Sequence, residues 1–95
     1  PNEQAGHDAL EKYIVTYGFN SDKYTIKTFI DMYCKNCKRY PHMVATKLGA
    51  DINTKMSTFK NNQRALKLFA KTIKGIEGWK AGTIDVAYAY EKAYA

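Results

Sequence analysis

Apolar positions in the first part of the chain recur with the spacing of an α-helix. Between residues 3 and 17 they are one, three or four residues apart and share one helical face. These positions are Ala5, Ala9, Leu10, Tyr13, Ile14 and Tyr17. Gly18 is a suitable stop, because glycine readily takes the left-handed conformation that ends many helices.

A second helix is predicted over residues 22–39, with Ser21 as its N-cap. Its apolar side is again helical in spacing and holds Ile26, Phe29, Ile30, Tyr33, Cys34 and Cys37. The residue before Pro41 avoids helical geometry, so this helix ends there.

Shorter helices are predicted for the rest of the chain. They cover residues 41–48 (stopped by Gly49), residues 53–62 with Met56 and Phe59 inward, the strongly amphipathic residues 63–74, and residues 84–95. No apolar alternation of period two extends over more than a few residues. The pattern predicts an all-α fold, a compact bundle of five to six short helices forming a single domain over residues 1–95.

Charge changes the picture, because it is concentrated in the centre of the chain. The net charge is +6, and residues 23–74 carry twelve Lys and Arg against only Asp31 and Asp51. A basic segment of this kind is typical of a face that binds a polyanion, although a solvated lysine-rich surface is the alternative. Thirteen of the fifteen basic residues are Lys, which suits phosphate attraction better than base reading.

Within residues 41–62, Ala45 lies four residues before Gly49, and the apolar Val44 and Leu48 directly precede them. This spacing resembles that of a helix-turn-helix, a motif of DNA-binding proteins in which a small residue lies four before the turn glycine. The apolar positions expected six and nine after the glycine are displaced by one residue, onto Met56 and Phe59. A turn one residue longer restores the register.

The resemblance implies a small transcriptional regulator that places its second helix in the major groove of double-stranded DNA. Residues 53–63 contain no acid, which also favours a polyanion partner. The base-contact candidates are Thr54, Lys55, Ser57, Thr58 and Asn61. The phosphate-contact candidates are Lys47, Lys60, Asn62, Arg64 and Lys67.

A second function class fits the same composition, a helical module that docks on another protein as an inhibitor or adaptor. Its interface candidates are Trp79, Tyr88 and Tyr94, because aromatic residues are frequent in protein interfaces. The last helix could also form a homodimer. DNA, RNA and protein remain open as partners at this stage.

Catalytic and metal chemistry have little support in the sequence. No set of nucleophile, base and orienting group is evident and no phosphate loop occurs, so we expect a non-enzymatic protein without cofactor. Cys34, Cys37 and His42 match three ligands of a zinc knuckle, but the fourth falls on Lys47, so no metal is expected. Reduced core thiols, the absence of a membrane-spanning run and the absence of a signal peptide favour a cytoplasmic protein.

Overall fold

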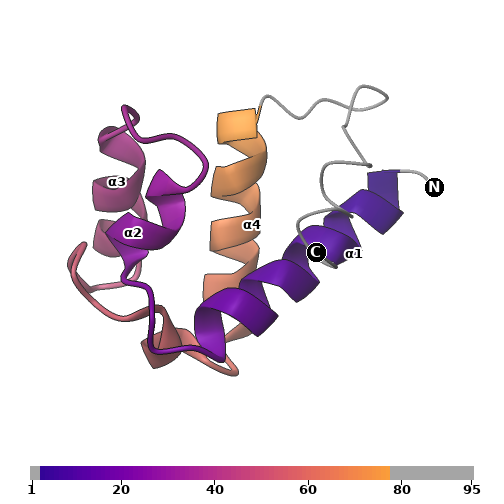
Figure 1. Ribbon diagram of the computed structural model, residues 1–95, viewed down its shortest axis with the longest axis horizontal. Coiled ribbons are helices and arrows are strands. Elements are labelled where there is room, and N and C mark those ends of the chain that lie inside the picture. Colours follow the sequence, from indigo (N-terminus) through magenta and orange to yellow (C-terminus); the bar gives the residue numbers. More distant parts are fainter. Residues whose placement is uncertain (1–2, 78–95) are drawn as a thin grey trace.

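A computed structural model describes residues 3–77, which are all-α (Figure 1). They form four α-helices and two short helical turns of other types: α1 (Glu3–Tyr13), the π-helical η1 (Ile14–Phe19), α2 (Ile26–Asp31), α3 (Arg39–Lys47), the 3-10 turn η2 (Met56–Phe59) and α4 (Gln63–Glu77). Five of the five to six predicted helices fall within these residues, where the structure has four α-helices, so the predicted number was slightly too high. The helix predicted over residues 84–95 lies outside the described residues. Between residues 3 and 77 no helix has the length and apolar character needed to cross a membrane.

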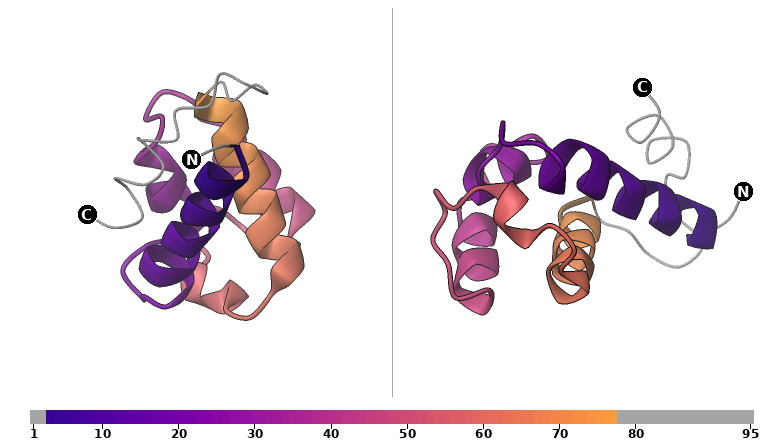
Figure 2. Two further views of the ribbon diagram at one scale, coloured as in Figure 1. Left: turned by 90° about the vertical axis from the view of Figure 1, so that its right-hand side faces the viewer. Right: turned by 90° about the horizontal axis from the view of Figure 1, so that it is seen from below.

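The central helix of the fold is α4. It packs against α1 and against α3, α3 also packs against α2, and η1 packs against η2 (Figures 1 and 2). The inward positions predicted for α4 are all buried: Ala65, Leu66, Phe69, Ala70 and Ile73. One core cluster joins them to residues of every other helical element. The helices thus share a single apolar core.

The first helix does not stop at Gly18. It continues as η1 to Phe19, and the Asn20 N–H donates to the Val15 carbonyl at 2.9 Å, a π-type bond. Gly18 is buried, and a Cβ there would lie 3.1 Å from Met56 Cε and 3.2 Å from Phe29 Cε1. Because Gly18 has no side chain, η1 can pack closely against η2 and α2. The apolar periodicity of one helix could not indicate this contact.

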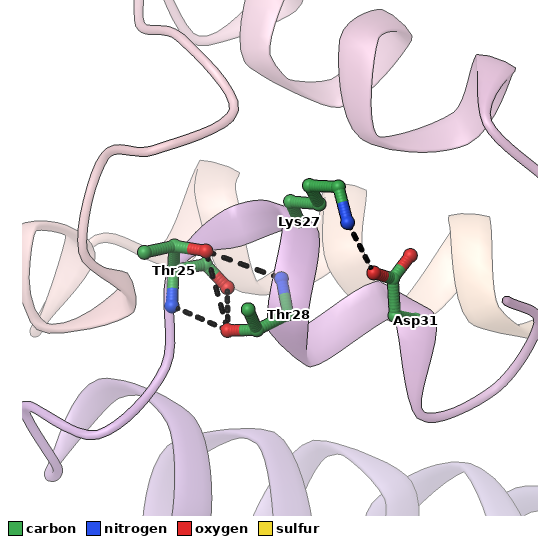
Figure 3. Close-up of polar contacts among 4 residues, drawn as sticks. All are labelled: Thr25, Lys27, Thr28 and Asp31. Carbon is green, nitrogen blue, oxygen red and sulfur yellow. Dashed lines mark hydrogen bonds and ion pairs between the residues drawn. The ribbon is translucent and has the colours of Figure 1, made fainter.

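The second helix is much shorter than predicted and begins at Ile26. Thr25 rather than Ser21 caps it, through a reciprocal pair of bonds with Thr28 (Figure 3). Two more N–H groups of the first turn have no acceptor within the helix, those of Ile26 and Lys27. They donate to the Thr54 and Ile52 carbonyls at 2.9 and 3.0 Å. Distant backbone thus completes the start of α2.

The same contacts explain why residues 53–62 are not the predicted α-helix. The Ile52 and Thr54 carbonyls are taken by α2, and Lys55 is extended at φ −66° and ψ 141°. Only Met56–Phe59 coil, as one 3-10 turn, before Asn61 takes a left-handed φ of 65°. Met56 and Phe59 are nevertheless buried, as predicted.

The glycine turn after α3 is confirmed. Gly49 has a φ of +65°, and the Ala50 N–H donates to the Ala45 carbonyl at 2.9 Å. The helix begins at Arg39, two residues before the predicted start, so Pro41 lies in the first turn where its missing N–H removes no intrahelical bond.

Candidate nucleic-acid interface

The outer side of α3 is exposed and carries basic and polar side chains. The helix packs inward through Pro41, Val44 and Ala45, which lie three and four residues apart and are buried. The opposite side, which we call the α3 face, consists of Arg39, His42, Met43, Thr46 and Lys47, all exposed. No acid occurs anywhere in α3. An acid-free helix face of this kind attracts phosphate and offers several hydrogen-bond donors.

A basic pocket of about 240 Å³ lies beside this face. Residues of α2, the turn after it, α3 and the loop after α3 line it: Lys27, Asp31, Lys35, Lys38, Pro41, His42 and Ile52. Its one carboxylate is already paired, because Lys27 Nζ lies 2.8 Å from Asp31 Oδ2 (Figure 3). Within residues 3–77, no ion pair joins Lys35 or Lys38 to an acid. The pocket therefore keeps a net positive charge next to the α3 face.

The turn between α2 and α3 holds a disulfide. Cys34 and Cys37 are bonded to each other, so the prediction of reduced core thiols within a helix was wrong. An i,i+3 bridge is awkward inside an α-helix, and here the helix has ended at Asp31 before the first cysteine. The correction also removes the thiol argument for a cytoplasmic location. Residues 3–77 contain no group of three or more His, Cys, Asp and Glu side chains suited to a metal ion.

The base-contact candidates do not share one helix face. Lys55 Nζ donates to the Asp22 carbonyl at 2.9 Å, and Thr54 Oγ1 accepts from the Asp51 N–H at 3.2 Å. Ser57 is half-buried, while Thr58 and Asn61 are exposed on either side of the bend after η2. The Lys55 side chain thus holds the loop against the segment before α2, whereas the Thr54 side chain closes a turn within the loop.

Three of the phosphate-contact candidates also have partners inside the domain. The Asn62 Oδ1 accepts the Ala65 N–H at 3.0 Å, Arg64 donates to the Lys47 carbonyl at 3.2 Å, and Lys67 Nζ lies 2.9 Å from Glu11 Oε2. They cap α4 and connect it to α3 and α1. Lys60 and Lys47 are exposed, and Lys47 belongs to the α3 face.

The interface candidates Trp79, Tyr88 and Tyr94 lie outside the described residues. Comparison of the chain with protein-family models, with curated proteins and with solved structures found no significant match. Inferences about function therefore depend on the geometry above.

Sequence reasoning overlooked most of the α3 face and the basic pocket, although a signal was present. Residues 32–50 contain no acid but hold Lys35, Lys38, Arg39 and Lys47. Like residues 53–63, this stretch is free of acids, but it was assigned to one helix end and to the supporting helix of the motif. The fold instead exposes these four basic side chains on α3 and on the turn before it.

Proposed function

We propose that this domain binds double-stranded DNA and places the α3 face in the major groove. The single observation that supports this most is the acid-free, exposed α3 face beside the basic pocket. An α-helix with its side chains is about 10–12 Å across, which fits the major-groove width of about 12 Å, and the nine residues of α3 make about two and a half turns. A small transcriptional regulator is the biological role that such a domain would suit.

The basic and polar side chains of the α3 face have roles in this proposal that follow from their chemistry. Arg39 offers a planar fork of donors that matches the O6 and N7 atoms of guanine, which Lys cannot reproduce. Thr46 and His42 have short polar side chains that can hydrogen-bond to base edges when the helix lies in the groove. Lys47, Lys35 and Lys38 flank them as phosphate contacts, which position the protein on the duplex without reading its sequence.

The supporting test is fluorescence anisotropy of a labelled random duplex at low and moderate salt. Binding should weaken with salt, by about 0.9 log units per log unit of salt for each phosphate contact. Lys47→Glu should remove one contact and lower that slope by roughly 0.9, and it leaves the buried side of α3 untouched. Lys71→Glu, an exposed charge reversal on α4, is the matched control.

A second pair of variants distinguishes the two candidate surfaces. Arg39→Lys keeps the charge but removes the fork, so it should reduce preference among duplex sequences while random-duplex binding persists. Lys55→Gln should weaken binding less than Lys47→Glu, because the Lys55 ammonium is held at the Asp22 carbonyl, outside the α3 face. The proposal fails if low-salt binding is absent, if Lys47→Glu binds like the wild type, or if double-stranded RNA competes better than DNA.

A further inference from the structure

The Cys34–Cys37 disulfide stabilises the fold less than a bridge that closes a long loop. It bridges residues three apart in sequence, and the stabilisation given by a disulfide grows with the length of the loop that it closes. The backbone already closes this turn: the Cys34 N–H donates to the Ile30 carbonyl at 3.2 Å and the Tyr40 N–H to the Cys37 carbonyl at 3.1 Å. The α2–α3 contact itself lies elsewhere, in buried residues such as Ile30 and Val44.

Positive charge surrounds the bridge. Lys35 lies between the two cysteines, Lys38 and Arg39 follow directly, and all three side chains are exposed. The nearest acid in the sequence, Asp31, is paired with Lys27 at 2.8 Å. Such surroundings stabilise a thiolate, which is both the nucleophile and the leaving group when a disulfide is exchanged.

The turn that carries the bridge lies at the surface of the domain. Both cysteines are half-buried, whereas the residues between them, Lys35 and Asn36, are exposed. The turn therefore presents its bridge at the surface rather than in the core, where a structural disulfide would be shielded.

From this geometry we propose that Cys34 and Cys37 form a thiol–disulfide exchange site whose partner is a dithiol reductant. A thiolate of the reductant attacks the Sγ of one cysteine, forming a mixed disulfide, and the other cysteine leaves as a thiolate. The second thiol of the reductant, as its thiolate, then displaces the first cysteine. The reductant becomes a disulfide, while the chain gains two electrons and two protons as two thiols. The exchange itself requires no nucleic acid, although Lys35 and Lys38 are also phosphate contacts in the proposed function.

Dithiothreitol is the probe for the test, applied to the folded full chain purified without reductant. Free thiols are trapped with an alkylating agent at successive times and counted by intact mass, while circular dichroism records the helix content. We expect complete exchange in native buffer with the helical signal retained. The proposal is overturned if the native chain stays oxidised until denaturant is added, or if the purified chain already has free thiols.

Charge variants test the cause of the reactivity. Lys35→Glu and Lys38→Glu combined should slow the exchange roughly three- to tenfold, because the new carboxylates repel both the incoming and the departing thiolate. Lys71→Glu makes the same kind of change on α4 and should leave the rate unaltered. Equal rates in all three proteins would overturn the proposal.

Discussion

Asn62 lies at the start of α4, where the structure and the sequence assign it different roles. The sequence suggested a phosphate contact, but its side-chain Oδ1 accepts the Ala65 N–H at 3.0 Å, as an N-cap does. Its carbonyl also accepts the Leu66 N–H at 3.0 Å. Asn62→Ala removes the side-chain bond and leaves one helix-end donor without its acceptor.

The expected loss is about 1 kcal/mol of unfolding free energy, the typical effect of replacing an Asn cap by Ala. For a domain of this size that corresponds to a melting temperature lower by about 4–8 °C. Asn62→Asp keeps an acceptor and adds a negative charge where α4 has no acid in its first turn. It should be as stable as the wild type, or more stable by a few tenths of a kcal/mol.

Urea denaturation followed by circular dichroism measures this series, with an unchanged m-value showing that only stability has altered. We expect the Asn62→Asp variant to have an unfolding free energy equal to or above that of the wild type, and the Asn62→Ala variant to have a lower one. The capping argument is refuted if Asn62→Ala melts like the wild type, or if Asn62→Asp is as unstable as Asn62→Ala.

Two further predictions concern the core and its tyrosines. Met56 is fully buried in η2, so Met56→Ala should cost about 2–5 kcal/mol in urea denaturation, and a loss below about 1 kcal/mol would mean that η2 does not close the core. Burial, followed by the neighbouring charges of ionised Tyr24 and Tyr17, raises the pKa of Tyr13 above its ordinary value. As pH rises, Tyr13 therefore ionises in the unfolded chain at a lower pH than in the folded chain. The stability that the neutral phenol gives the folded state is fully present below the unfolded pKa of about 10, and it is lost as pH rises through the higher folded pKa. Tyr13→Phe should lose stability less steeply than the wild type in urea titrations across this range, and parallel pH profiles would contradict the assignment.

The amino-acid sequence by itself determined the elements whose information is local. The 3.6-residue periodicity of α4 gave its buried face correctly, because a long amphipathic helix needs only one apolar stripe. Gly49 likewise ended α3 as predicted, since the left-handed turn is a property of glycine itself. The all-α class followed from such local signals, and so did the burial of Met56 and Phe59.

Tertiary structure decided the features that depend on distant backbone and on charge in space. Residues 53–62 lost their helix because the Ile52 and Thr54 carbonyls complete the start of α2, a contact that joins segments more than twenty residues apart. Lys55 and Arg64 became internal donors for the same reason, since each binds a carbonyl far away along the chain, that of Asp22 or of Lys47. The surface that we propose for DNA binding is consequently on α3 and not on the predicted second helix. The α3 face is exposed because the opposite, apolar side of the helix packs on α2 and α4.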